Sequence, residues 1–327
     1  MGKYDTECKY LIDMYYDNDN QSALIRVYKE TRALLEKGRY IDDRMVEGTV
    51  LYSEPFSVAD VPARFNTVIN VKREDSLIVA RLLHLKGLNV AVLNMASEAV
   101  AGGGCREGII AQEESMCRRT SLVMSLEKFS TRPPLFDRRI EPNYGGIFSP
   151  HVTVFRSPER TDCVILKDPF NVSFISVPAV NNPALTGPGR MRPELQEIAR
   201  NKIRTIMRIA ISNGCDALVL GAWGCGSYRN PPAQIASLFH EIFDEAEFKN
   251  KVAEISFAIL EDRNSWERTN PKGNLQPFIE EFEKTAAGVR EGSGNPGRGL
   301  LQQSPAHGKG PRLLRQGHRN GITGTNQ

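Results

Sequence analysis

At 327 residues with 40% hydrophobic content, the chain is long enough to bury one substantial core. The 42 lysines and arginines exceed the 39 acidic residues by too little for bulk nucleic-acid binding, so we expect any anion to bind at a local site. No apolar run approaches the roughly 18 residues of a membrane span, and residues 1–20 lack a signal-peptide core. We expect an intracellular monomer, cytoplasmic or nuclear, with no membrane contact.

Six cysteines are scattered along the chain without CxxC pairs or histidines at ligand spacing. That pattern favours neither a structural zinc site nor a disulfide framework. We therefore expect reduced thiols, no metal and no cofactor.

The first half of the chain alternates helix and strand patterns. Apolar residues recur at helical spacing over residues 22–37. An apolar run at 67–71, a helical pattern at 76–86 and a second apolar run at 90–94 predict a β-α-β unit. The next helix is predicted over residues 112–129.

The second half continues this alternation after an irregular, proline-rich connection. Short strands are predicted at residues 151–155, 163–167 and 172–177, followed by a long helix over 193–212. A final strand, helix and strand are predicted at 216–220, 232–246 and 253–260. Together these elements predict an α/β fold, with a mixed or largely parallel sheet sandwiched by helices.

The stretch over residues 92–119 is the most informative for chemistry, because a buried strand leads into a glycine loop and then into a helix that opens with acids. The glycines are Gly102, Gly103 and Gly104, and the helix opens with Gln112, Glu113 and Glu114. Adjacent glycines permit positive φ and close approach, so successive N–H groups can bind phosphate oxygens. Acids are favoured in a first helical turn in any case, and glycine loops alone are weak evidence.

A second predicted strand leads into a glycine loop over residues 216–232, and the helix that follows begins with proline. Strand ends of an α/β sheet share one edge, so the two loops can face each other across a crevice. Neither loop is followed by the GK[ST] of a nucleotide hydrolase, and neither has the GxGxxG of a dinucleotide fold. What remains is a diphosphate ligand beside paired carboxylates, which suit acid-base attack on a glycosidic bond.

Three glycines, seven residues and then Gln-Glu-Glu resemble the signature of poly(ADP-ribose) glycohydrolases of the macrodomain superfamily, and the surrounding sequence is similar to the shorter, microbial-type members. The resemblance covers residues 66–262. It includes LNMAS before the first loop, SPHVTVFR at 149–156 and GAWGCGSYRNPP after the penultimate strand. It implies a macrodomain-like fold, an enzyme that reverses ADP-ribosylation, as in the DNA damage response, and poly(ADP-ribose), ADP-ribose and ADP-ribosylated proteins as partners.

The resemblance also sets the expected domain boundaries. Residues 1–60 would form an N-terminal helical accessory segment, 61–270 the catalytic domain and 271–327 a C-terminal extension. After residue 287 the composition shifts to Gly, Arg, Gln, Ser, Pro and Asn, which predicts disorder because little apolar surface can be buried.

Site roles follow from the resemblance. Glu114 would protonate the ribose oxygen that leaves the anomeric carbon and then activate water, while Glu113 would hydrogen-bond the ribose hydroxyls. The remaining expected ligand contacts are Gln112, which helps place the loop, Asn94 at the distal ribose, Gly102, Gly103, Gly104, Gly224, Cys225 and Gly226 around the diphosphate, and Tyr228 against the terminal ribose. We expect the adenine contacts around residues 71–75.

The chain departs from the family at three positions near the loops. The family often has proline where this chain has Ala101, a bulky aromatic residue where it has Cys105, and phenylalanine where it has Tyr228. A tyrosine keeps the ring, so that contact should persist, whereas Cys105 and the following Arg106 put the shape of the first loop in question.

Two other functions of the same fold stay open at this point. A macrodomain that binds ADP-ribose without cleaving it would keep both glycine loops but would not require the paired acids. A hydrolase that removes mono(ADP-ribose) from a protein side chain breaks a bond at the same anomeric carbon, so the sequence separates it poorly. A third hypothesis, an interaction protein acting through its tail, depends only on the basic composition after residue 287.

Overall fold

The computed structural model describes residues 18–129, 143–262, 265 and 270–291. Its centre is a mixed sheet of seven strands in the order β1-β4-β5-β3-β8-β9-β2. The strands are β1 (Val50–Tyr52), β2 (Val68–Lys72), β3 (Val90–Asn94), β4 (Gly146–Arg156), β5 (Ile165–Ser176), β8 (Ala217–Leu220) and β9 (Glu254–Ala258). The five from β5 to β2 run parallel, whereas β1, β4 and β5 pair antiparallel. This confirms the predicted α/β class.

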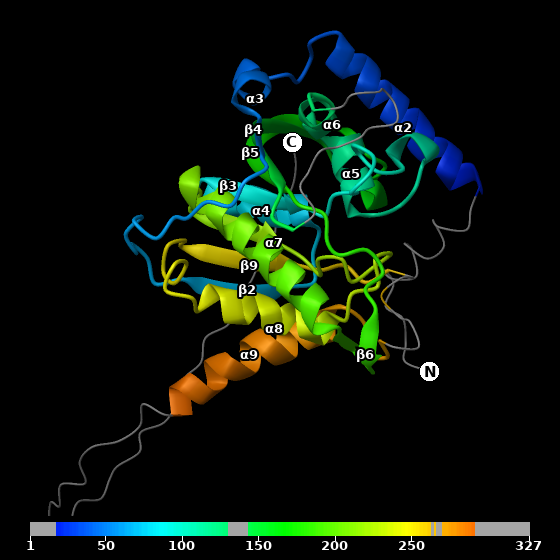
Figure 1. Ribbon diagram of the computed structural model, residues 1–327. Helices are drawn as coiled ribbons and strands as arrows, with labels where there is room; N and C mark the ends of the chain where they lie inside the picture. The colour runs from blue at the N-terminus through cyan, green and yellow to red at the C-terminus, as the bar shows by residue number, and fades with distance from the viewer. Residues whose placement is uncertain (1–17, 130–142, 263–264, 266–269, 292–327) are drawn as a thin grey trace, which may run out of the picture.

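Helices cover both faces of the sheet, as Figure 1 shows. One layer contains α2 (Asn18–Glu36), α3 (Asp43–Gly48), α4 (Ser76–Leu85), α5 (Gln112–Arg119) and α6 (Leu122–Glu127). The other contains α7 (Pro193–Ser212), α8 (Pro232–Phe243) and α9 (Leu275–Glu291). Shorter elements are the 3-10 turns η1 (Cys105–Glu107) and η2 (Glu159–Thr161) and a hairpin of β6 (Leu185–Gly187) and β7 (Arg190–Met191).

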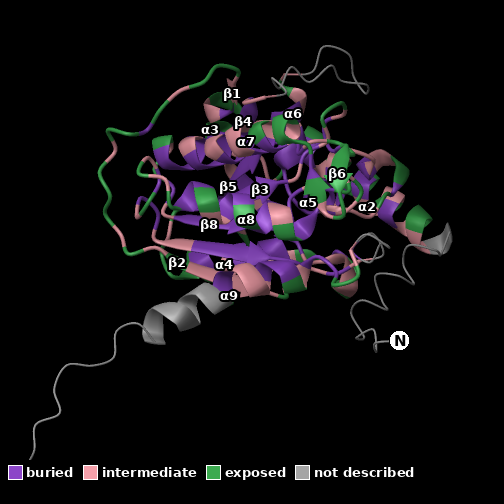
Figure 2. Cartoon of the chain, turned by 60° about the horizontal axis from the view of Figure 1, so that its bottom comes forward, coloured by how far each residue is buried: buried purple, intermediate pink, exposed green. Residues whose placement is uncertain are grey.

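The alternation of side chains along the central strands explains why both faces are covered. In β3, Ala91 and Leu93 pack into the core under α7 and α8, while Val90 and Val92 pack into the core under α4 and α5. All five residues of β3 are buried, and the sheet is purple throughout its centre in Figure 2. A strand buried on both faces reads as a continuous apolar run, which is why β3 and β8 were predictable.

The helix predicted over residues 112–129 is wrong as one element, because the chain leaves helical geometry at Thr120. Thr120 is extended, with φ −139° and ψ 173°, and forms an isolated bridge to Val154 of β4. Its Oγ1 accepts a hydrogen bond from Leu122 N and donates one to Met116 O. A pairing with a strand distant in sequence therefore divides the segment into α5 and α6.

The two strands predicted at residues 163–167 and 172–177 are a single strand, β5. The stretch between them begins with exposed Asp168 and Pro169, which interrupt the apolar pattern while the backbone stays extended. Pairing with β4 continues on both sides of these residues, at Ile165 and at Phe170, and a register shift between Val154 and Arg156 accommodates the residues between.

The chain segments outside the predicted catalytic domain pack against it. Tyr28 and Leu35 of α2 lie in the core under α5, and Phe278 and Phe282 of α9 lie in the core under α8. Helix α9 was not predicted; the part of the expected disordered tail beyond residue 291 lies outside the described residues. Among the described helices, none is both long enough and apolar enough to cross a bilayer.

Candidate active site

A cavity of about 610 Å³ opens at the carboxyl ends of the parallel strands. Its walls come from the loop after β3, the start of α5, the loop after β8 and the residues after β9. Open α/β sheets bind ligands at this edge, and the volume lies within the range of about 300–1,000 Å³ that is usual for small-molecule sites.

Glu113 lies in the first turn of α5, where only 3% of its surface is exposed. Its Oε1 accepts hydrogen bonds from Gly102 N and from Asn94 Nδ2, both at 3.2 Å, and its Oε2 accepts one from Ser97 N at 2.6 Å. Three N–H donors therefore fix this carboxylate and stabilise negative charge on it. Glu113 ties α5 to β3 and to the glycine loop.

Glu114 lies beside it on the cavity wall. Its Oε1 accepts a hydrogen bond from Gly104 N at 2.9 Å. Burial, together with the neighbouring Glu113 carboxylate, raises the pKa of Glu114 to about 7. A carboxyl group with such a pKa can both donate a proton and take it back near neutral pH.

The three glycines of the first loop are needed for different reasons. Gly102 and Gly103 have φ of 81° and 52°, in the left-handed region. A Cβ on Gly103 would overlap Glu114 Oε1, and one on Gly104 would lie 2.6 Å from Ile109 Cγ1. Gly103 and Gly104 line the cavity, whereas Gly102 is buried and its N–H faces Glu113 instead of the cavity.

The second glycine loop, after β8, forms the opposite wall through Gly224 and Gly226. Gly224 has φ of 72°, and a Cβ there would overlap the Ala179 Cβ. Asn230 Nδ2 donates to Gly224 O at 2.9 Å and to Val180 O at 2.7 Å, so one amide holds this loop against the segment after β5.

Cys225 and Tyr228 differ in their relation to the cavity. Cys225 is 4% exposed and its thiol points to Trp223 O, so its side chain does not line the wall, and burial raises the pKa of this thiol. Tyr228 does line the wall, and its hydroxyl accepts a hydrogen bond from Glu98 N at 3.2 Å. Partial burial raises the pKa of the Tyr228 phenol.

Asn94 and Gln112 connect β3 to α5. Gln112, on the cavity wall, accepts from Met95 N at 2.9 Å and donates to Leu93 O at 2.7 Å. Asn94 is fully buried, and its Nδ2 donates to Glu113. The structure therefore places the Asn94 amide against Glu113, where it positions that carboxylate, and its Oδ1 has no hydrogen-bond partner among the described residues.

Two acidic residues of the wall form ion pairs that were not predicted. Glu159 of η2 lines the cavity, accepts from Ser115 Oγ at 2.9 Å and pairs with buried Arg118 at 3.2 Å. Asp75, within the segment expected near adenine, also lines it and pairs with buried Arg119 at 2.7 Å. No local motif marks these pairs, because the fold brings the partners together from distant segments.

Ion pairs hold the first glycine loop in place, although Cys105 and Arg106 depart from the residues usual in the family. Cys105 is fully buried, and Arg106 donates to Ala101 O at 3.2 Å and pairs with Glu127 of α6 at 2.7 Å. Glu127 also pairs with Arg32 of α2 at 2.5 Å. The first loop is thus held to both α6 and the N-terminal helix.

Within the described residues, no group of three or more His, Cys, Asp or Glu side chains is arranged to hold a metal ion. The wall instead combines two glycine loops, which a ligand can approach closely, with a carboxyl pair of which one member can transfer a proton. That arrangement suits attack on a bond next to a phosphorylated sugar.

Comparison with known proteins agrees with this chemistry. A family model described as "Microbial-type PARG, catalytic domain" matches residues 25–157. The crystal structure of poly(ADP-ribose) glycohydrolase (PARG) from Thermomonospora curvata, bound to the inhibitor ADP-HPD, is 30% identical, with a TM-score of 0.64 over 80% of this chain and 100% of that one. The chain belongs to the microbial-type PARG family. It is therefore a glycohydrolase.

A second PARG structure, from Deinococcus radiodurans in complex with ADP-ribose, is 28% identical, with a TM-score of 0.58 over 74% of this chain and 97% of that one. A comparison with curated proteins found no match. The residues that match the PARG family model begin inside α2 and include the first glycine loop, Glu113 and Glu114.

Proposed function

We propose that the protein hydrolyses the ribose–ribose O-glycosidic bonds of poly(ADP-ribose) and releases ADP-ribose, with Glu114 as general acid and base. The observation that carries this proposal is the position of Glu114, on the cavity wall between two glycine loops, with a pKa of about 7. The ADP-HPD and ADP-ribose bound by the two bacterial PARG structures support a diphosphate ligand.

In the first step, neutral Glu114 donates its proton to the oxygen that leaves the anomeric carbon. The glycosidic bond breaks with both electrons going to that oxygen, and positive charge spreads over the ring oxygen and the anomeric carbon. Glu113, fixed by three N–H donors, lies next to this charge and stabilises it.

In the second step, the Glu114 carboxylate takes a proton from water as the water oxygen bonds to the anomeric carbon. The products are ADP-ribose and a shortened polymer, and Glu114 ends neutral, as it began. The diphosphate lies between Gly103 and Gly104 on one wall and Gly224 and Gly226 on the other, where the absence of side chains allows close approach, and Tyr228 packs against the ribose.

The test is release of ADP-ribose from automodified poly(ADP-ribose), with ADP-ribose binding measured by calorimetry. Release together with binding is the expected result. Binding without release would make the protein a reader, and release only from mono(ADP-ribosyl)ated protein would make it a hydrolase of the single protein-linked unit. Neither binding nor release would overturn the ligand assignment.

The pH profile of turnover follows from the raised pKa of Glu114. Below about pH 7 Glu114 of the free protein is protonated and can act as the acid, so kcat/KM should fall as pH rises above 7, by about tenfold per pH unit on the basic limb. Steady-state kinetics across that limb would measure this. A kcat/KM that stays constant two units above neutrality would contradict the assignment of the acid.

Gly103→Ala should lower kcat by about tenfold or more, because the new Cβ would overlap Glu114 Oε1 and displace the acid. Gly38→Ala is the matched control, since Gly38 also has positive φ, 72°, but has open space around its Cα. The control should share the backbone strain, which lowers the free energy of unfolding by about 1 kcal/mol, and keep full activity. Equal activity of the two variants would contradict the close packing of Gly103 on Glu114.

A further inference from the structure

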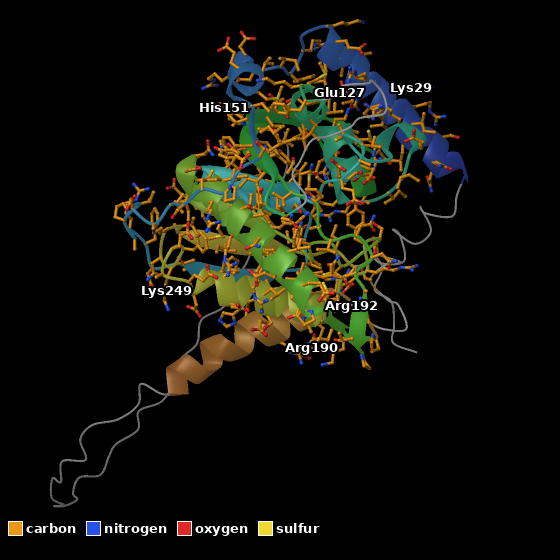
Figure 3. All side chains as sticks on the ribbon, in the orientation of Figure 1. Lys29, Glu127, His151, Arg190, Arg192 and Lys249 are labelled. Atoms are coloured by element: carbon orange, nitrogen blue, oxygen red, sulfur yellow. The ribbon has the colours of Figure 1, made fainter. Side chains whose placement is uncertain are left out.

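Two arginines lie where the β6–β7 hairpin leads into α7: Arg190 belongs to β7, and Arg192 directly precedes the first residue of α7. Arg190 and Arg192 are exposed, and between them Met191 is fully buried in the core. Side chains of an extended segment alternate in direction, so the inward Met191 directs both arginines outward, with Cα atoms about 6.6 Å apart. Figure 3 labels both beside β6.

The base of the hairpin is joined to the rim near the acid pair. Asn182 N donates to Tyr228 O at 2.9 Å, and Asn181 Nδ2 donates to Glu98 Oε1 at 3.0 Å. The Tyr228 hydroxyl bonds Glu98 N, and the preceding residue, Ser97, bonds Glu113. In Figures 1 and 2 the hairpin and α5 lie toward the same end of the sheet.

These arginines differ from others nearby in lacking an acidic partner. Arg200, Arg204 and Arg208 of α7 all pair with glutamates of α8 or the segment after it. No acid in the described part of the chain is within ion-pair distance of Arg190 or Arg192, although exposed Glu194 follows in sequence. Two guanidinium groups at this spacing can each bind one phosphate group of a diphosphate. Arginine binds a phosphate through two parallel hydrogen bonds.

We propose that Arg190 and Arg192 bind the diphosphate of the ADP-ribose unit adjacent to the one in the cavity. This inference rests on the proposed function. The bond to be cut lies at Glu114, so the adjoining unit lies outside the cavity on the side of the acid pair, where Tyr228 joins the cavity wall to the segment before the hairpin. Every unit of the polymer contains a diphosphate, so a bound polymer can place a second diphosphate at the hairpin. Free ADP-ribose has a single diphosphate, which lies in the cavity.

The test removes both charges in the Arg190→Gln/Arg192→Gln variant. KM for poly(ADP-ribose) should rise at least about tenfold, kcat should stay within about twofold, and the Kd for ADP-ribose should not change. The control, Arg26→Gln/Lys29→Gln, removes two charges from exposed positions of α2 and should change none of these.

Polymer binding is also measured by fluorescence anisotropy, with both arginines present and with both replaced, in a Glu114→Gln background. Polymer binding that is at least about tenfold weaker when both arginines are replaced would support the proposal. This holds even if the wild type releases no ADP-ribose, because that result would reject only the proposed function. Unchanged polymer affinity alongside normal turnover would overturn the hairpin proposal and leave the proposed function intact. Polymer that binds neither protein would overturn both.

Discussion

Glu114→Gln is expected to lower kcat for ADP-ribose release by at least about 100-fold. The amide has the shape of the acid, but its N–H protons are not acidic enough to be transferred to the leaving oxygen, and it is not basic enough to take a proton from water. Its oxygen can still accept the hydrogen bond from Gly104 N, so the first loop should keep its conformation. The loss should therefore appear in kcat, measured at saturating polymer.

Binding separates this loss from damage to the site. ADP-ribose affinity of Glu114→Gln, measured by calorimetry, should stay within a few fold, because the loops that hold the diphosphate are unchanged. Glu47→Gln, which removes the same charge from an exposed position of α3, is the control and should be fully active. Turnover by Glu114→Gln within about threefold of the wild type would exclude Glu114 as the proton donor.

The parts of the site that the sequence predicts are those in which structure and chemistry lie in one continuous segment. β3, the glycine loop and the start of α5 follow each other within residues 90–114, and their patterns specify strand, turn and helix locally. The loop after β8 is similar. Because strand ends of a parallel sheet share an edge, two such segments suffice to place both loops around one cavity.

What the sequence does not predict depends on contacts between distant segments. The break at Thr120 exists because a strand 34 residues later pairs with it. The resemblance assigns Asn94 to the distal ribose, but only the tertiary arrangement shows that its amide is buried against Glu113. The same holds for Glu159, whose partner Arg118 lies 41 residues earlier, so no local pattern could bring it to the cavity.

Arg119→Met is expected to lower the free energy of unfolding by about 3–5 kcal/mol, because it leaves the charge of Asp75 buried without its partner. The Arg119 guanidinium, 2% exposed, binds both oxygens of Asp75, at 2.7 and 3.0 Å. Asp75 in turn caps α4 by accepting from Leu77 N and Ile78 N. Urea unfolding would measure the loss. Lys249→Met, which breaks an exposed pair with Asp244, is the control and should cost less than about 1 kcal/mol.

The pH dependence of this loss tests its cause. Burial alone would raise the pKa of Asp75, but Arg119 and the two N–H donors lower it below its ordinary value of 3.8. A lowered folded-state pKa stabilises the fold above the unfolded-state pKa, and that contribution is lost as pH falls through the folded-state value. In Arg119→Met the buried carboxyl group can escape the penalty by protonation, so the loss should shrink toward pH 4. If the loss of unfolding free energy is the same at pH 4 and pH 7, its cause is the lost packing of the Arg119 side chain and not the charge left on Asp75.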